Sequence, residues 1–508
     1  MSRLPLLSLL IFAPWAGALL LAALPRLSPK AARGTAFAFS LSTLLFSLAV
    51  WSGFDPAVTG YQFVEQHEWI HALNVHYHLG LDGMSLLLVL LTGIVSPLAL
   101  GAALHPTSNP RVLGLLFLVL QGSALGVFLA LNFFHWFIFW ELSLVPAFFL
   151  IKLWGGAGAG RAAYQFVIYT IAGSAFLLLG FAALYAATGT LDFTELTQLA
   201  LGGGLAALLG PTAGLAVFLG VFLGLAVKVP LFPFHTWLPS AYAEAPTGVS
   251  MFLTGVMSKM GVYGFLRILW PLFPAQLHAC AGPLLWLALG GVVFGAFAAI
   301  KQTDLKRMIA YSSVNHLSYC LLALFAVAAS QPGQNSAAVA AAFSGALLQM
   351  FNHGLSAAAL FYCLGVLERR SGGLRGIGDF GGVRSAAPVF AGLCGIAMFS
   401  SLGLPGLNGF VGEFLIFLGV FGLAPWAAAV ATLGLLATAM FLLTFWQRVF
   451  HGPRSGAAAG DFRDLDRGEL ATLIPLIALM FVFGVLPHLL ADLINPLVAA
   501  WGNSLPLP

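Results

Sequence analysis

Apolar stretches of membrane-spanning length recur along nearly the whole chain. A hydrocarbon core about 30 Å thick is crossed by about 20 helical residues, and these stretches have that length. The pattern therefore predicts an all-α membrane protein. About fourteen transmembrane helices are expected, near residues 5–24, 35–53, 83–104, 111–130, 133–151, 162–187, 212–229, 246–269, 283–300, 307–328, 337–366, 386–404, 427–447 and 470–491.

Proline and glycine interrupt two of the predicted helices. The seventh runs into Lys228-Val-Pro-Leu-Phe-Pro233, and the twelfth is broken between Gly403 and Gly409. The breaks lie five helices apart, so the two discontinuous helices cross the membrane in opposite directions. Helices 4–8 and 9–13 are therefore predicted to be two inverted five-helix repeats, and matching broken helices point to an ion pathway. A simple proline kink in each helix is the alternative.

Four regions follow from this plan. Residues 1–110 hold helices one to three, 111–270 the first repeat, 283–450 the second repeat, and 451–508 a cytoplasmic loop and helix fourteen. The composition agrees with a membrane protein, because only 7% of the residues are charged, against about 25% in soluble proteins. The bases are scattered singly, which argues against a nucleic-acid partner.

The positions of the basic residues predict the orientation. When each loop is numbered by the helix that it follows, the even loops hold no base. The odd loops hold 17 of the 21 bases: Arg26, Lys30, Arg33, Arg111, Lys152, Arg161, Lys301, Lys306, Arg307, Arg369, Arg370, Arg375, Arg384, Arg448, Arg454, Arg463 and Arg467. By the positive-inside rule the odd loops are cytoplasmic, and both termini lie on the outer, periplasmic side.

The sequence contains two groups of potential metal ligands. The outer loop 53–82 carries histidines and acids, namely Asp55, Glu65, His67, Glu68, His71, His76, His78 and Asp82. A metal site is one interpretation, but histidine and aromatic residues are also common at membrane interfaces. The cysteines are far apart and form no CxxC pair, so we expect neither zinc nor an iron–sulfur cluster: Cys280, Cys320, Cys363 and Cys394.

Four ionisable residues lie inside predicted helices. They are Glu141, Lys228, Lys259 and Glu413. A charge at the bilayer centre costs at least ~2.5–3.5 kcal/mol on insertion scales, so such residues usually serve transport. Paired charges that only hold helices together are the alternative.

These residues suggest a proton relay. A nearby carboxylate stabilises the charged form of a desolvated lysine, so moving or protonating Glu141 would make Lys228 release its proton. Lys259 would receive that proton, and Glu413 would be the terminal group towards the outside. Intervening steps could use His316 and His353, and entry could use His235, because imidazole exchanges protons near neutral pH. For each histidine a purely structural hydrogen-bonding role is the alternative. An ammonium cannot coordinate a metal ion, which favours H⁺ over Na⁺.

Several segments resemble a known family. Residues 228–247 (KVPLFPFHTWLPSAYAEAPT) resemble the hallmark segment of antiporter-like subunits. Residues 79–85, 139–146 and 404–414 resemble subunit M of bacterial NADH–quinone oxidoreductase, respiratory complex I. The other antiporter-like subunits of the complex have a lysine-containing pattern at the end of helix twelve. Glu413 in this sequence matches the pattern of subunit M instead.

The resemblance implies a function and a set of partners. It implies a proton-translocating subunit of the inner membrane of a bacterium, next to other antiporter-like subunits. NADH, FMN, iron–sulfur clusters and quinone would be held by partner subunits, no cofactor would be bound here, and the isolated chain would not be catalytic. Glu141 and Lys228 would be the key pair, with Lys259 and His353 the central relay and Glu413 the exit or the link to the next subunit.

Two other hypotheses are compatible with the sequence. The same fold could serve a cation/proton antiporter complex, a membrane-bound hydrogenase or an inorganic-carbon uptake complex. The chain could also be a structural scaffold that couples its neighbours and conducts nothing.

Overall fold

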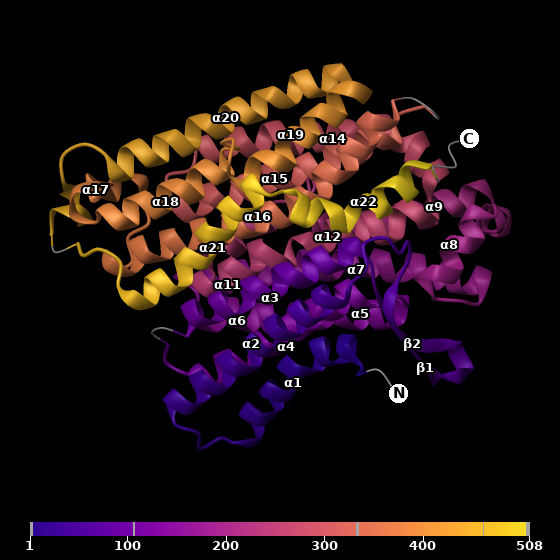
Figure 1. Cartoon of the computed structure of the whole chain (residues 1–508), viewed down its shortest axis with the longest axis horizontal. Helices are drawn as coiled ribbons and strands as arrows, with labels where there is room; N and C mark the ends of the chain where they lie inside the picture. Colours follow the sequence, from indigo (N-terminus) through magenta and orange to yellow (C-terminus); the bar gives the residue numbers. More distant parts are fainter. Residues whose placement is uncertain (1–3, 105–106, 332–334, 461, 504–508) are drawn as a thin grey trace.

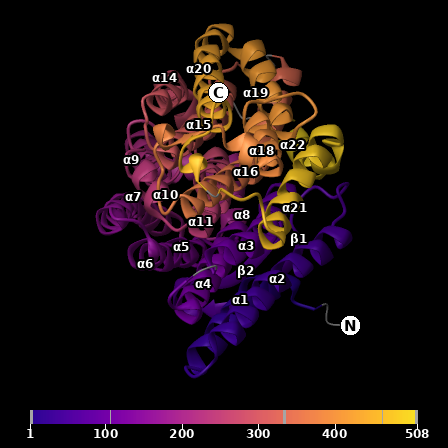
Figure 2. The same ribbon diagram turned by 90° about the vertical axis from the view of Figure 1, so that its left-hand side faces the viewer.

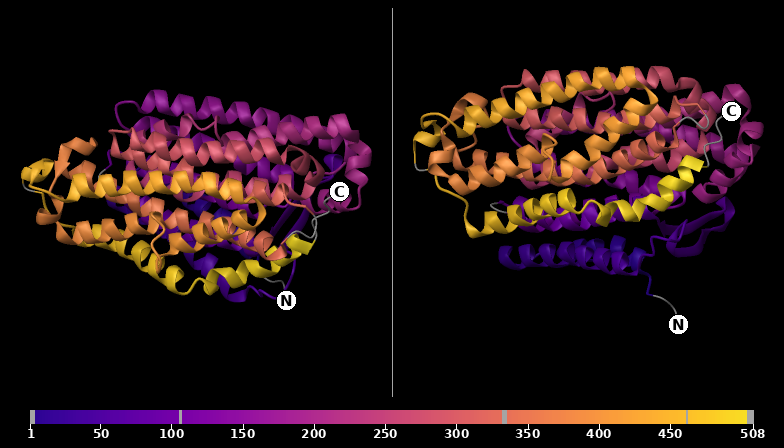
Figure 3. Two further views of the ribbon diagram at one scale, coloured as in Figure 1. Left: turned by 90° about the horizontal axis from the view of Figure 1, so that it is seen from above. Right: turned by 45° about the horizontal axis from the view of Figure 1, so that its top comes forward.

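The computed structural model describes residues 4–104, 107–331, 335–460 and 462–503. Long helices lie side by side with roughly parallel axes (Figures 1 and 3). Within the described ranges, thirteen helices are long and apolar enough to cross a membrane. A further crossing is made by two shorter helices in series, α18 (Pro388–Ser401) and α19 (Asn408–Leu423). The prediction of about fourteen transmembrane helices is therefore confirmed.

The other crossings keep the predicted order. They are α1 (Leu6–Ala23), α2 (Pro29–Gly53), α3 (Gly83–Ala103), α4 (Pro110–Leu129), α5 with α6 (Phe133–Leu142, Leu144–Trp154), α7 (Ala159–Thr188), α9 (Gly204–Lys228), α11 to α13 (Thr247–Leu272), α14 (Pro274–Ile300), α15 (Leu305–Ala328), α16 (Ser336–Arg370), α20 (Pro425–Phe450) and α21 (Arg467–Val485). Helices α2 and α14 begin earlier than predicted, each at a proline. Proline fits the first helical turn, where the missing N–H needs no partner.

Two features correct the sequence-based picture. The predicted last helix, 470–491, is wrong at its end, because α21 stops at Val485 and a separate helix, α22 (His488–Asn503), follows Pro487. Proline lacks the N–H that would continue the helix. The predicted outer loop 53–82 contains a β-hairpin, with β1 (Gln62–Ile70) antiparallel to β2 (Val75–Leu81).

Short elements complete the chain at the ends of the bundle. They are α8 (Phe193–Leu201), α10 (Trp237–Glu244), α17 (Val383–Ala386) and a minimal ladder between β3 (Phe380–Gly381) and β4 (Ser455–Gly456). The hairpin, α8 and both ends of the chain lie at one end of the bundle, and α17 lies at the opposite end (Figures 1 and 3). Figure 2 looks along the bundle from the α17 end. The arrangement agrees with an even number of crossings.

The α17 end carries ion pairs between helix ends. Lys306 Nζ lies 2.5 Å from Glu368 Oε2, and Arg375 contacts Glu244 and Asp304 at 3.1 and 3.2 Å. These contacts join α10, α15 and α16. The bases that set the predicted orientation therefore also fix the helix ends to one another.

The hairpin end is also held by polar contacts. His78 Nδ1 lies 2.5 Å from Asp192 Oδ2, where both side chains are buried. Burial alone would raise the pKa of Asp192, but the hydrogen bonds from His78 and Thr194 prevail and lower it. A second contact, between His71 Nδ1 and Glu68 Oε1, is 2.5 Å long and exposed. His71 and His78 thus pair with different carboxylates.

Burial divides the helices into two groups. The residues of α16 and of the span from Thr247 to Leu272 are buried almost completely, whereas α2, α7, α9 and α21 expose much of their surface. The exposed surface is apolar, as Leu179 with 68% exposure illustrates. Lipid-facing helices need such surfaces. The buried central helices carry the polar residues described next.

Candidate functional site

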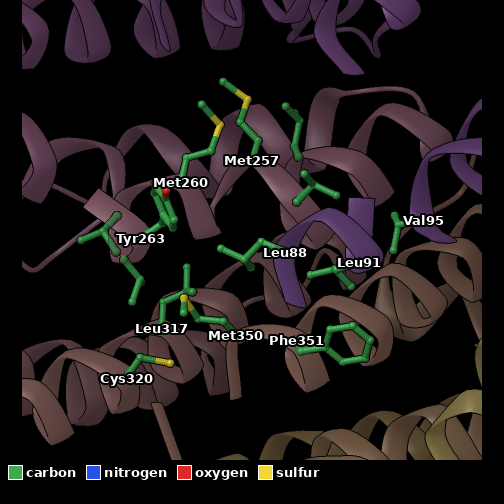
Figure 4. Close-up of a cluster of buried hydrophobic side chains, with 14 of the residues drawn as sticks. Leu88, Leu91, Val95, Met257, Met260, Tyr263, Leu317, Cys320, Met350 and Phe351 are labelled. Atoms are coloured by element: carbon green, nitrogen blue, oxygen red, sulfur yellow. The ribbon is translucent and has the colours of Figure 1, made fainter. Parts of the chain in front are cut away.

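The centre of the bundle is an apolar layer between α3, α12 (Lys259–Gly264), α15 and α16. Figure 4 shows Leu88, Met260, Leu317 and Met350 among the side chains of this layer. All four are at most 2% exposed. A charged group in such surroundings has lost most of its water, so its protein contacts decide where a proton can stay.

Lys259 lies within this layer and is 0% exposed. Two π-helical turns, Leu253–Met257 and Phe265–Leu269, flank its helix. Such turns widen a helix and often mark functional sites. Lys259 Nζ donates to the backbone carbonyl of Thr254 and lies 2.9 Å from His353 Nδ1. The ammonium can therefore pass a proton directly to the imidazole.

His353 begins a line of polar side chains that ends at the break in helix twelve. The rings of His353 and His316 have their centroids 5.2 Å apart. His316 Nδ1 lies 2.9 Å from Glu413 Oε1, and Gln349 Nε2 donates to the same oxygen at 3.3 Å. On its other side, His316 Nε2 lies 3.3 Å from Ser401 Oγ. One imidazole therefore connects a carboxylate to a hydroxyl across three helices.

Polar side chains hold the break between α18 and α19. Ser400 Oγ donates to Asn408 Oδ1 at 2.6 Å, and Asn352 Nδ2 donates to the carbonyl of Asn408 at 2.7 Å. Gly409 is required here, because a Cβ atom would lie 1.9 Å from the carbonyl oxygen of Ser400. These contacts satisfy backbone groups that a continuous helix would pair internally.

The first half of the chain places its charges differently. Lys228 ends α9 and is 2% exposed, yet its Nζ has no hydrogen-bond partner among the described residues. Its ammonium lies 5.0 Å from the centroid of the Trp140 ring. Glu141, the next residue on α5, acts on it electrostatically, but Glu141 Oε1 is likewise buried without a hydrogen-bond partner. The predicted key pair is brought together without a direct contact.

The break after Lys228 is organised by proline and tryptophan. Trp237 Nε1 donates to the carbonyl of Val227 at 3.0 Å, across the turn between α9 and α10. His235 lies in this turn, buried between aromatic rings, with centroids 5.6 Å from Phe232 and 6.2 Å from Tyr311. Its Nδ1 has no hydrogen-bond partner in the described structure. His235 is therefore close to the break but not bonded to Lys228.

Close backbone packing places Lys228 next to the helix of Lys259. A Cβ atom on Gly261 would lie 2.7 Å from the backbone nitrogen of Val229. The end of α9, with Lys228, thus lies against the helix that carries Lys259. The structure brings Lys259, His353, His316 and Glu413 into one line and places Lys228 beside it.

Several residues of this site were not singled out in the sequence. Gln349 lies four positions before His353 and so shares a helix face with it, a signal that could have identified it. No such signal identifies Asn352, Ser400 and Asn408, because only the tertiary structure brings them together. The hydroxyl of Ser313 is hydrogen-bonded to the hydroxyl of Thr254, with the oxygens 3.0 Å apart. Asn315 instead donates to the carbonyl of Val292 on α14, at 2.7 Å.

Potential metal ligands are dispersed. Across the described parts of the chain, no three histidine, cysteine, aspartate or glutamate side chains lie together as a metal site would require. The four cysteines are free thiols.

Comparisons with known proteins identify the family. The family model described as "NADH:quinone oxidoreductase/Mrp antiporter, TM" matches residues 130–440. The NADH-quinone oxidoreductase subunit M of Rhodobacter capsulatus is 38% identical over 511 residues, which cover 97% of this chain and 96% of that protein.

Solved structures share the fold. A chain of respiratory complex I from Thermus thermophilus is 30% identical, with a TM-score of 0.85 and coverage of 98% of this chain and 99% of that chain. A chain of the Mrp complex from Dietzia also has a TM-score of 0.85, covering 99% and 98%, but at 20% identity the likeness concerns the fold alone. The family model matches more than half of this chain, and the relative from Rhodobacter capsulatus is more than 30% identical over nearly the full length of both proteins. The chain therefore belongs to the family of NADH-quinone oxidoreductase subunit M.

Proposed function

We propose that this chain is the antiporter-like subunit M of a bacterial NADH–quinone oxidoreductase and translocates protons across the membrane. The observation that carries the proposal is the line of buried ionisable contacts from Lys259 through His353 and His316 to Glu413. Burying four ionisable side chains is costly, and helix packing alone does not require it.

The first step takes place between Glu141 and Lys228. Without a hydrogen bond, the ammonium form of Lys228 depends mainly on the carboxylate charge of Glu141. When Glu141 moves or is protonated, the ammonium loses that stabilisation and releases its proton. His235, at the break beside it, is the entry group on the cytoplasmic side.

The second step carries the proton along the line. Lys259 passes a proton to His353 over 2.9 Å. Water or a ring movement closes the gap to His316, whose partner Glu413 then takes the proton at 2.9 Å. Glu413 lies at the helix-twelve break, where it releases the proton or connects to the next subunit.

The energy comes from partner subunits. Moving one charge against 100 mV costs ~2.3 kcal/mol. In our proposal NADH oxidation and quinone reduction occur in those partners, which hold FMN, iron–sulfur clusters and quinone. This chain contributes a translocase subunit, binds no cofactor and is not catalytic alone. It resides in the bacterial inner membrane, with the α17 end cytoplasmic and both termini periplasmic.

The test is purification of the native complex, followed by two measurements. Mass spectrometry should find dehydrogenase and quinone-site subunits as companions; only hydrogenase or Mrp-type companions would contradict the assignment. In the same complex, Lys259→Met should abolish proton pumping in vesicles while the subunit composition is unchanged. Normal pumping in that variant would favour a scaffold that conducts nothing.

A further inference from the structure

A cavity unrelated to the proton line opens at the α17 end of the bundle. Its volume is about 490 Å³. Helix α3 forms the floor, with α2 on one side and α21 on the other, as the order of these helices in Figures 1 and 2 shows. The floor is lined in part by the small residues Pro97, Gly101 and Ala102, which leave room for an occupant. The cavity is therefore a trench between α2 and α21, two helices that face lipid.

The cavity is polar at one end and apolar at the other. Arg369, Asp466 and Glu469 line the polar end, and Phe37 lines the apolar end. From Phe37 an exposed apolar stripe continues along α2 at helical spacing, through Leu41, Leu45 and Leu48. A molecule with a charged head and a long apolar chain matches both ends.

The charges at the polar end specify the kind of head. Glu469 Oε1 accepts from Arg369 at 3.2 Å, and its other oxygen accepts from Arg370. Arg369 is still 29% exposed, so its guanidinium can contact a further anion. Asp466 is exposed, and within the described part of the chain its carboxylate accepts only from the backbone N–H of Glu469, at 2.8 Å. The charges of the two arginines and the two carboxylates cancel. The positive and negative groups nevertheless stand at different places, so each can bind an opposite charge.

We propose that this cavity binds one phosphatidylethanolamine molecule of the cytoplasmic leaflet. The phosphate contacts Arg369, because guanidinium groups bind phosphate oxygens through charge-assisted hydrogen bonds. The primary ammonium contacts Asp466, and one acyl chain follows the trench along α2. An anionic lipid fits less well, since it cannot satisfy Asp466. A lipid in this position packs α2 and α3 against α21.

The test uses photoreactive phosphatidylethanolamine with a diazirine on one acyl chain. The intact complex is reconstituted into phosphatidylglycerol vesicles that contain this probe, and labelled peptides are mapped. Labelling is expected on the first turns of α21 and on α2. Unlabelled phosphatidylethanolamine should compete best, phosphatidylcholine less well because it lacks N–H donors, and phosphatidylglycerol least.

Matched variants locate the site. Gly101→Leu fills the trench and should reduce labelling about tenfold, equivalent to 1.4 kcal/mol. Gly101→Ala is the control, because its Cβ would meet only Phe37, at 3.9 Å. Asp466→Asn keeps a residue that can cap α21 but removes the charge, so it should weaken competition by phosphatidylethanolamine and not by phosphatidylglycerol. Arg384→Gln removes an exposed base from the same end and should change nothing.

Three results would overturn the proposal. Unchanged labelling in Gly101→Leu would show that the lipid does not occupy the trench. Should that variant fail to assemble, the Asp466→Asn competition decides, and equal competition by both lipids would reject the ethanolamine head. Cross-links between Phe37 and a helix of a partner subunit would show that protein fills the cavity.

Discussion

The two broken helices occupy matching positions in the predicted repeats, but they hold their charges differently. At the first break, Lys228 Nζ and Glu141 Oε1 are buried and have no hydrogen-bond partner among the described residues. At the second, Glu413 accepts a hydrogen bond from Gln349, and its Oε1 lies 2.9 Å from His316 Nδ1. A buried charge without partners has a high free energy, and a small movement changes it strongly. We infer that the first break controls the proton and the second break receives it.

The breaks also differ in what keeps them open. The first contains two prolines and is fastened by Trp237, whereas the second contains one proline, Pro405, and is fastened by side chains of Asn352, Ser400 and Asn408. A side-chain network is more easily weakened by mutation than a proline. The four predictions below test this contrast, beginning with the largest expected effect.

Removing the controlling charge should have the largest effect. Lys228→Met should reduce proton pumping by about 100-fold, in line with the loss of a positioned proton-transfer group. The measurement is acidification of vesicles that contain the assembled complex. Lys152→Met is the control, because this lysine is exposed and bonds Tyr164, away from Lys228. Near-normal pumping in Lys228→Met would refute the assignment of control to the first break.

Changing the receiving carboxylate should have a smaller effect. Glu413→Gln keeps an oxygen beside His316 but cannot hold the proton, so pumping should fall about tenfold, equivalent to ~1.4 kcal/mol in the barrier. Gln349→Leu removes one hydrogen bond, worth about 1 kcal/mol, and should slow pumping a few-fold. Equal losses in both variants would show that the hydrogen bonds, and not the charge, determine the rate.

The side-chain network at the second break should be sensitive to packing. Gly409→Ala places a methyl group against the Ser400 carbonyl and should destabilise the subunit by about 1–3 kcal/mol, the usual cost of overpacking. Thermal unfolding of the purified complex measures this. Gly392→Ala, in α18, is the control, because no atom lies within 4 Å of its added Cβ. A stable Gly409→Ala variant would contradict the close packing of α19 on α18.

The smallest effect concerns the hairpin end of the bundle. The pKa of Asp192 is lowered in the folded protein, so its contribution to stability is present above its unfolded pKa of about 4 and is lost as the pH falls through the lower folded pKa. Thermal stability should therefore drop below about pH 4. Asp192→Asn should flatten this dependence, and an unchanged acid profile in that variant would contradict the role of the His78 pair.

Local chemistry made much of this site predictable. Apolar stretches located the crossings, and the prolines and glycines near Lys228 and Glu413 located both breaks. The hairpin at 62–81 and the separate α22 were missed, because their patterns are short and lie outside the lipid-facing segments. Ser401 and the carbonyl of Thr254 were missed because ordinary polar residues have no distinctive spacing, whereas Gln349 could have been found from its helical spacing to His353.

The sequence by itself determined that the chain spans a membrane, where its helices break and which charges are buried. These properties depend on hydrophobicity and backbone chemistry, which each segment carries alone. Only the tertiary structure decided that Lys259 contacts His353, that His316 contacts Glu413 and that Lys228 has no hydrogen-bond partner among the described residues. Such contacts join residues up to 97 positions apart (413 minus 316), so they depend on how helices pack and not on any local pattern.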